Sequence, residues 1–514
     1  MRPHPVPRTV AAVASVFAVS LAALPLPDVA SGKEPKPRKS IATAKVLSGN
    51  TAPAPLKPVD PYGPLPVPVR PVNIIPLSPA EQLGKNLLFD TTLSNPRGYA
   101  CATCHIPATG FTGPSSAVNE GLGPVPGVVA GRFGRRKPQA INYAAFSPTG
   151  PVFNADLQVW LGGNFWDGRA PDLAGQARMP FLDPNEMNNP AIGPLPPHSG
   201  GYSSLVAHNV RFGPFFRLFE DVFGPAALLL ATDAEVYTMV TRAIAAYESS
   251  AEVNPFSSRY DASQFGVPPA NGYRLSPSEA NGLALFFGRA QCFQCHSSAT
   301  LVPVLNATGG KNTFTMYCYA NIGVPKNQNN PFYHQTSAQA DPLGYNPLGA
   351  SFIDFGLGAN PNPAPSGGLF MHRVPGDIPQ FRGLFKAPSL RNVDKRPSAS
   401  FVKSYMHNGV FKSLQDVVHF YNKRNIAVDA LGNESAFDLR TGPPAGSTPL
   451  FPPPEVLDNV QNVAGVTPEN AGDDVATNGQ VGNLSLSDDE EADVVSFLKI
   501  LTDGYTRPNP IDAP

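Results

Sequence analysis

The 514-residue sequence has almost no excess of charge of either sign and, after its first residues, no long apolar run. Its formal net charge of -1 leaves no basic surface of the kind that binds nucleic acid, so nucleic acid is not expected as a partner. No segment after Leu24 is long enough to cross a membrane as a helix. These absences argue against a nucleic-acid-binding protein and against a membrane span in the mature chain.

Proline and glycine, in contrast, are abundant, with 60 and 46 residues. Such numbers require long irregular connections between the ordered parts of the chain. The sequence is nevertheless 42% hydrophobic, and its length suffices for two or three domains with separate cores. We expect a globular protein whose longest loops lie at about 300–380 and 430–484, where Asn, Pro and Gly dominate.

The N-terminus has the pattern of a signal peptide. Two arginines precede an apolar run from Val10 to Leu24, and small residues follow. Residues 1–31 are therefore predicted to be removed, and residues 32–75 form a Pro- and Lys-rich tether that cannot bury a core. This pattern indicates an exported, periplasmic protein, with an uncleaved anchor as the alternative.

A helix start occurs twice, each time shortly before a pair of cysteines. Ser78 is placed to cap the first helix, Pro79 takes its first position, and Glu81 completes a capping box. The segment "LSPSEANGLALFFGRA" repeats this arrangement from Ser276. A third capped helix, "LSDDEEADVVSFLKILT", closes the chain. The repeat indicates two related domains.

Four of the five cysteines lie in two C-x-x-C-H motifs, "CATCH" and "CFQCH". This spacing is typical of covalent haem, because two thiols add to the two vinyl groups and the adjacent histidine binds the iron. The predicted ligands of two haem c groups are Cys101, Cys104 and His105 for one, and Cys292, Cys295 and His296 for the other.

Two other interpretations of the cysteine pairs explain the motifs less well. Structural disulfides would not require a histidine after each pair. One zinc site would require two pairs far apart in the sequence to meet. Cys318 remains outside both motifs and is expected to be a buried free thiol.

A longer series of motifs resembles a known family. It includes "LGKNLLFD", "CATCHIPATGFT", "FWDGRAPDLAGQARMPFLDPNEM", "CFQCH", "NIGVP", "FKAPSLRNV" and "YMHNGVFKSLQDVVHFYN". With these motifs in order, residues 77–505 resemble the bacterial dihaem cytochrome c peroxidases and their MauG-like relatives. The resemblance implies a mainly α fold with two cytochrome c-like haem domains and long irregular loops. Residues 76–255 would form the N-terminal peroxidatic domain, and residues 256–514 the C-terminal haem domain with its loop insertions.

The resemblance also assigns roles to four residues in the segment that begins with "FWDGR". Trp166 would lie between the haems and shorten the electron-transfer path, although it could also be simple core. Gln176 and Pro180, which share a helix face, and Glu186 would line the peroxide pocket. Glu186 is the candidate acid and base, Gln176 its hydrogen-bonding neighbour, and Pro180 helps to keep the distal side open. Without the resemblance, these three would be a polar surface, a helix breaker and a solvated charge.

Two departures from the family pattern matter. Many of these peroxidases carry a loop histidine that must leave the iron before peroxide binds, whereas this sequence has no histidine between His105 and His198. The N-terminal haem is therefore expected to have an open sixth position, as in MauG-like members. Arg136 replaces an asparagine through which the family often binds calcium. A fixed cation there opposes calcium, although the resemblance leaves the ion possible.

The segment "SYMHNGVFKSLQDVVHFYN" predicts a helix that begins with a capping box between Ser413 and Asp416 and whose apolar face includes Tyr421. In the family, the second axial ligand of the C-terminal haem lies fourteen residues after the histidine that corresponds to His407. The resemblance thus makes Tyr421 that ligand. Two alternatives stay open. Tyr421 could simply be part of the apolar core face of its helix, or Met406 or His407 could be the ligand instead.

The predicted function is a MauG-like haem peroxidase that uses hydrogen peroxide to form high-valent haem iron and oxidises a protein or another electron donor. A tyrosine ligand favours oxidised iron, whereas a methionine would raise the potential as in conventional members. The alternatives are a conventional peroxidase fed by a small redox protein, an oxygenase-type relative acting on an external substrate, and a plain electron-carrying dihaem cytochrome.

Overall fold

The computed structural model describes residues 76–157, 159–193, 201–264, 273–336, 346–359, 379–461 and 480–505. All of them belong to one unit, Pro61–Pro514. The predicted signal peptide and tether, residues 1–31 and 32–75, lie outside the described residues. Among the helices in the described ranges, none combines the length and hydropathy that a membrane crossing requires.

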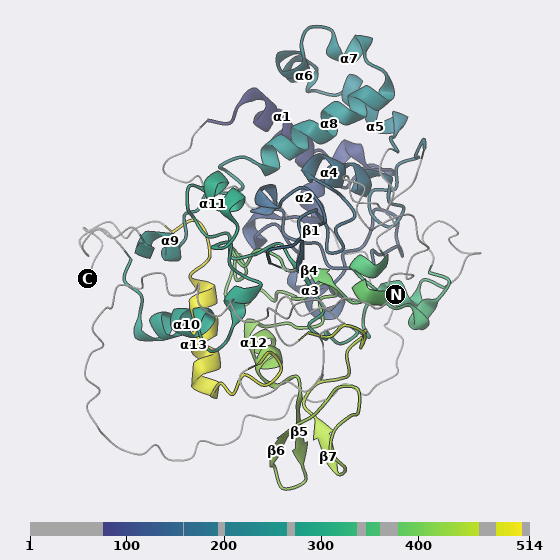
Figure 1. Ribbon diagram of the computed structural model, residues 1–514. Coiled ribbons are helices and arrows are strands. Elements are labelled where there is room, and N and C mark those ends of the chain that lie inside the picture. Colours follow the sequence, from purple (N-terminus) through teal and green to yellow (C-terminus); the bar gives the residue numbers. More distant parts are fainter. Residues whose placement is uncertain are drawn as a thin grey trace, which may run out of the picture. The chain divides into compact units, whose positions relative to one another are not determined.

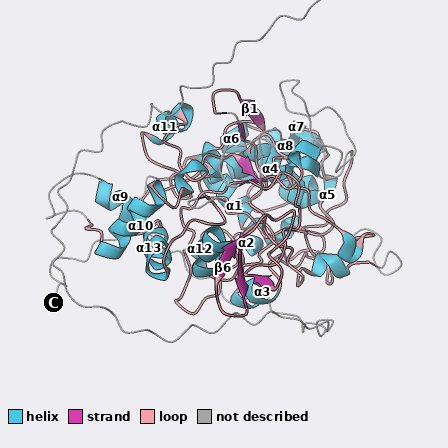
Figure 2. Ribbon diagram, turned by 60° about the horizontal axis from the view of Figure 1, so that its bottom comes forward, coloured by secondary structure: helices cyan, strands magenta, loops and turns pink. Residues whose placement is uncertain are grey.

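The described chain is mainly helical, as expected, and its strands are short (Figures 1 and 2). The helices are α1 (Pro79–Leu88), α2 (Cys101–Cys104), α3 (Ser116–Gly121), α4 (Leu173–Leu182), α5 (Ser204–Arg211), α6 (Phe216–Phe223), α7 (Ala227–Leu230), α8 (Asp233–Glu248), α9 (Arg259–Gln264), α10 (Pro277–Phe287), α11 (Val302–Thr308), α12 (Leu414–Lys423) and α13 (Asp488–Lys499). The strands are β1 (Val152–Asn154), β2 (Val159–Leu161), β3 (Tyr319–Ala320), β4 (Phe385–Lys386), β5 (Ile426–Asp429), β6 (Glu434–Ala436) and β7 (Ser447–Pro449).

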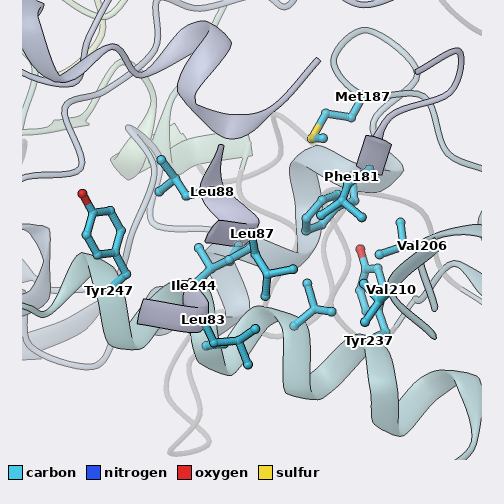
Figure 3. Packing of buried hydrophobic residues seen from close by; sticks show 14 of the residues in the cluster. Leu83, Leu87, Leu88, Phe181, Met187, Val206, Val210, Tyr237, Ile244 and Tyr247 are labelled. Atoms are coloured by element: carbon cyan, nitrogen blue, oxygen red, sulfur yellow. The ribbon is translucent and has the colours of Figure 1, made fainter. Parts of the chain in front are cut away.

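The first hydrophobic core forms where α1, α4 and α5 pack against α8. Ser78 caps α1 with the predicted capping box, in which Glu81 bonds back to the cap. The apolar side of α1, with Leu83 and Leu87, then faces Ile244 of α8 (Figure 3). This core contains residues from both sides of the first C-x-x-C-H motif and gives that motif a fixed support.

The second core repeats this construction with α10, α12 and α13. Ser276 caps α10 through the predicted box with Glu279, and Ser487 caps α13 with Glu490. Ser413 caps α12 by accepting a hydrogen bond from the Asp416 N–H, but among the described residues no bond from the Asp416 side chain back to the cap completes the predicted box. All the helix starts predicted from the sequence are thus confirmed.

One glycine in each half lets two helices approach closely. A Cβ at Gly84 of α1 would lie 1.8 Å from the carbonyl oxygen of Ala243 in α8. A Cβ at Gly282 of α10 would lie 1.9 Å from the carbonyl oxygen of Asp493 in α13. Each glycine follows its capping serine by the same number of residues, so the sequence repeat is also a repeat of helix packing.

The region expected as a loop at 430–484 contributes two strands, β6 and β7, to a small sheet whose central strand, β5, lies just before it. Strand β5 pairs antiparallel with both β6 and β7, in the order β6-β5-β7. The prediction of irregular chain was wrong for β6 and β7, because each strand has only three residues and no hydrophobic run. The remaining two-stranded sheets pair β1 with β2 and β3 with β4.

Two cysteine-lined cavities as the candidate active site

Each C-x-x-C-H motif forms one helical turn. In the first, the N–H of His105 donates to the carbonyl oxygen of Cys101 over 3.0 Å, and in the second His296 donates to Cys292 over 2.9 Å. This turn brings the first cysteine and the histidine of each motif onto one face. Each motif then lines one cavity with both its cysteines and its histidine.

Both histidines are oriented for metal binding through one ring nitrogen. Nδ1 of His105 lies 2.9 Å from the carbonyl oxygen of Phe111, and Nδ1 of His296 lies 3.2 Å from that of Pro388. A proton on Nδ1 satisfies these bonds and leaves Nε2 with a lone pair. Burial lowers the pKa of His105, and it lowers the pKa of His296 to about 4, so both rings are neutral at pH 7.

The cavity around the first motif, here the His105 cavity, brings together the predicted peroxide-pocket residues. Gln176 and Pro180 lie on α4, and Glu186 follows this helix; all three line the cavity with His105. Among its described lining residues, His105 is the single histidine. Met187 also lines it and packs in the first core, where Figure 3 places it near Phe181.

Glu186 is held in a state suited to proton transfer. Burial and the neighbouring charge of Asp183 raise the pKa of Glu186 to about 7, against the pull of Arg169 and Arg135. A carboxyl group with this pKa exists in both protonation states at neutral pH. It can therefore accept and return a proton, which is what an acid-base group must do.

The cavity around the second motif, here the His296 cavity, is lined mainly by apolar side chains. The apolar face of α12 points into it: Leu414, Val417, Val418 and Tyr421 all line the wall. Burial raises the pKa of Tyr421 above its ordinary value. Met406 and His407, the rival ligands, line the same cavity. The structure thus brings Tyr421 to His296, and it brings the rivals there as well.

Trp166 lines both cavities. It is 9% exposed, and its indole Nε1–H donates to the carbonyl oxygen of Lys137 over 2.9 Å. Its own carbonyl oxygen accepts a hydrogen bond from the N–H of Lys386 over 2.8 Å. These bonds fix the indole in the wall between the two cavities.

The polar groups in both walls fit a haem. Tyr405 and His407 line the His296 cavity. The hydroxyl group of Tyr405 and the Nε2 atom of His407 are buried and have no hydrogen-bond partner within the described chain. Such buried orphan groups are costly unless something binds them. Lys386 in this cavity and Lys137 in the His105 cavity carry amino groups whose pKa burial lowers to about 7, and in their protonated form they can pair with propionate carboxylates.

Some residues of the site have no signal in the sequence. Glu248, at the end of α8, lines the His105 cavity with a carboxyl group that is buried and has one oxygen without a hydrogen-bond partner in the described chain. Burial raises the pKa of Glu248 to about 8. Asp354 lines the other cavity, far from both motifs in the sequence. Cys318 is buried, as expected, and lies beside Cys295.

Comparisons with known proteins agree with this geometry. The family model for Di-haem cytochrome c peroxidase matches residues 78–266. The methylamine utilization protein MauG of Paracoccus denitrificans is 32% identical over 429 residues, which cover 83% of this chain and 89% of that protein. The cytochrome-c peroxidase IdrP1 of a Pseudomonas species is 28% identical over 402 residues, covering 75% of this chain and 81% of that protein.

A solved structure also matches. The diheme peroxidase BthA from Burkholderia thailandensis superposes with a TM-score of 0.57 at 28% identity, covering 86% of this chain and 91% of that one. Fold and cavities define a haem enzyme with two cofactor sites. The chain belongs to the dihaem cytochrome c peroxidase and MauG family. It is therefore an oxidoreductase that acts on peroxide and exchanges electrons with a redox partner.

Proposed function

We propose that this chain is an exported dihaem c-type peroxidase of the MauG-like kind, which oxidises a protein or another electron donor with hydrogen peroxide. Residues 76–255 form its peroxidatic domain and residues 256–514 its second haem domain, both cytochrome c-like. The observation that carries the proposal is the convergence of Gln176, Pro180 and Glu186 on the cavity of His105.

In this proposal, each haem is attached through thioether bonds and bound through one histidine. Cys101 and Cys104 would hold the first haem, and His105 would bind its iron. Cys292 and Cys295 would hold the second, with His296. The bound haems supply the redox chemistry of peroxide reduction, and the protein supplies ligands, proton transfer and an electron path.

Glu186 moves the proton that cleavage of the O–O bond requires. Its carboxylate would accept a proton from one oxygen of the peroxide and deliver it to the other oxygen, which leaves as water. Gln176 orients the peroxide by hydrogen bonding. Pro180 has no N–H and a compact ring, and it leaves the distal side open for peroxide.

Tyr421 would bind the iron of the second haem together with His296. A phenolate oxygen is a hard anionic donor that favours oxidised iron. Trp166, which lines both cavities, would provide the path for oxidising equivalents between them. This arrangement suits oxidation of a large substrate at a distance. One observation favours the conventional peroxidase instead: Met406 lines the same cavity and could serve as the ligand.

The test is the optical response of the fully oxidised, full-length protein to hydrogen peroxide. The MauG-like proposal expects a reaction without prior reduction, at a rate that pretreatment with a chemical oxidant does not change. A conventional peroxidase would react only after reduction of its second haem. An oxygenase would respond to dioxygen in the reduced state, and an electron carrier would not respond to peroxide.

A further inference from the structure

A buried cluster of charges lies in the wall between the two cavities. The guanidinium of Arg136 forms two hydrogen bonds with Asp354, from Nε to Oδ2 and from Nη2 to Oδ1, each 2.6 Å long. Its third nitrogen, Nη1, lies 2.7 Å from Oδ2 of Asp167. The side chains of Arg136, Asp167 and Asp354 are 6%, 1% and 5% exposed. One guanidinium thus joins two carboxylates that are far apart in the sequence.

The cluster touches both cavities. Arg136 lines the His105 cavity, and Asp354 lines the His296 cavity. The guanidinium carbon of Arg136 lies 5.4 Å from the ring centre of Phe385, and this ring stacks on His407 at 3.6 Å and 10°. Arg136 therefore connects the wall of one cavity with an aromatic stack of the other.

Two contacts in this wall link the segment Arg136–Lys137 to the segment Trp166–Asp167. Arg136 pairs with Asp167 through its side chain, and Lys137 accepts the hydrogen bond of Trp166 through its carbonyl oxygen. A shift of Arg136 would therefore move Asp167, the chain neighbour of Trp166, and Lys137, whose carbonyl oxygen accepts the indole hydrogen bond. Arg136 is connected to the electron path through the position that it imposes on these neighbours.

The charges in the cluster are compensated without a metal ion. Burial would raise the pKa of Asp167 and Asp354, but Arg136 lowers both below the usual range. Asp167 also pairs with Arg169 at 3.0 Å and with Arg135 at 3.3 Å. Calcium takes about six to eight oxygen ligands. Here the available carboxylate oxygens face guanidinium groups, and the described residues hold no group of three acidic, histidine or cysteine ligands for a metal.

We propose that Arg136 replaces the calcium ion expected in this family: its guanidinium is the fixed cation between the cavities, and it positions Trp166 for electron transfer. The inference rests on the proposed function for the two haems and the role of Trp166. A calcium site at Arg136 does not fit the residues present. A calcium ion would have to displace the bidentate ion pair between Arg136 and Asp354.

The experiment uses the full-length protein with both haems, whose number is first measured by mass spectrometry. Purified protein is dialysed against EGTA, and calcium is determined by elemental analysis. We expect less than one calcium per chain, with the melting temperature and the optical spectra of both haems unchanged by EGTA or added calcium. A stoichiometric calcium, or a spectral or thermal change on chelation, would overturn the proposal. Fewer than two haems would instead contradict the proposed function, and the calcium and melting results would still test Arg136.

The positioning role is tested with Arg136→Gln against Arg135→Gln. Arg135 is the neighbouring residue and also pairs with Asp167, but its side chain is 32% exposed. The readout is the rate of electron equilibration between the haems after pulsed reduction, measured well below the melting temperature. We expect Arg136→Gln to slow it about tenfold or more, since a 1 Å misplacement can cost about 10²-fold. Equal rates in the two variants would overturn the role.

Arg136→Gln leaves Asp354 buried without its cation, and such a variant can fail to fold. The double variant Arg136→Gln with Asp354→Asn removes both charges of the pair and keeps similar shapes. Its electron equilibration should be slowed as in the single variant. A wild-type rate in the double variant would show that the guanidinium does not position Trp166.

Discussion

Around His105, the cavity walls carry carboxyl, amide and guanidinium groups, whereas around His296 they are mainly aliphatic and aromatic. Both cavities are supported by the same C-x-x-C-H turn. Each is also supported by a serine-capped helix that crosses another helix closely at a glycine. The difference therefore comes from the segments that follow each motif: α4 with Glu186 on one side, and α12 with Tyr421 on the other. One scaffold repeated twice can thus provide a site for protons and peroxide and a site for electrons.

Removal of one cysteine pair at a time should break the comparison most strongly. Cys101→Ala with Cys104→Ala should leave one covalent haem and abolish the reaction with peroxide. Cys292→Ala with Cys295→Ala should also leave one haem but keep peroxide binding at the His105 site. Mass spectrometry and stopped-flow absorbance measure these results. A peroxide reaction that survives only in the first variant would exchange the roles of the two cavities.

Glu186→Gln should lower the rate of the peroxide reaction about a hundredfold or more, because a positioned acid-base group contributes typically 10²–10⁴-fold. The pKa of Glu186 is raised to about 7, and its carboxylate is the proton acceptor. The wild-type rate should therefore rise as the pH increases through about 7 and fall below it. The variant should lack this transition.

The matched control for Glu186 is Glu252→Gln, since Glu252 is a partly exposed carboxylate that pairs with Lys85 outside the cavity lining. It should keep the wild-type rate and pH profile. A rate for Glu186→Gln within about threefold of wild type would exclude Glu186 as the proton carrier.

Tyr421→Met should make the His296 site resemble that of a conventional peroxidase. The reduction potential of this haem should rise by on the order of 100 mV, within the roughly 0.8 V over which axial ligands set haem potentials. Redox titration followed by absorbance measures the change, and Met406→Leu is the control for the rival ligand. An unchanged potential in Tyr421→Met would mean that the tyrosine only packs, whereas a change in Met406→Leu would favour methionine.

The smallest effect is expected from the helix crossings. Gly84→Ala should lower the free energy of unfolding by about 1–3 kcal/mol, because the new Cβ would clash with the backbone carbonyl of Ala243 and the two helices would have to move apart. Gly282→Ala should do the same in the second core. Gly121→Ala in α3 is the control, since a Cβ there meets no atom of the described residues within 4 Å. Thermal unfolding measures all three, and equal melting temperatures for Gly84→Ala and Gly121→Ala would contradict the close crossing.

Local signals made much of this architecture predictable. Serine caps at Ser78, Ser276, Ser413 and Ser487 depend on neighbours within three residues, so the sequence contains the whole signal. The pocket residues Gln176, Pro180 and Glu186 came from a resemblance, and the structure brings them to one cavity with His105. Their roles stay predictions.

What the sequence could not provide depends on contacts between distant segments. Arg136 was noticed as an unexpected cation, but its partner Asp354 lies 218 residues away and no periodic pattern links them. Glu248 resembles any charged residue at a helix end until α8 packs and buries it. The strands β5 to β7 are too short for an alternation signal, so only their pairing defines them.

We propose that two C-x-x-C-H motifs of the same local geometry hold two unlike haems. The most direct measurement is the electron paramagnetic resonance spectrum of the fully oxidised, full-length protein as purified. An open site at His105 and a tyrosine-ligated site at His296 should give one high-spin and one low-spin signal of equal intensity. Two low-spin signals in the oxidised protein would contradict an open peroxide site at His105. They would also contradict the assignment of peroxide chemistry to one cavity and electron storage to the other.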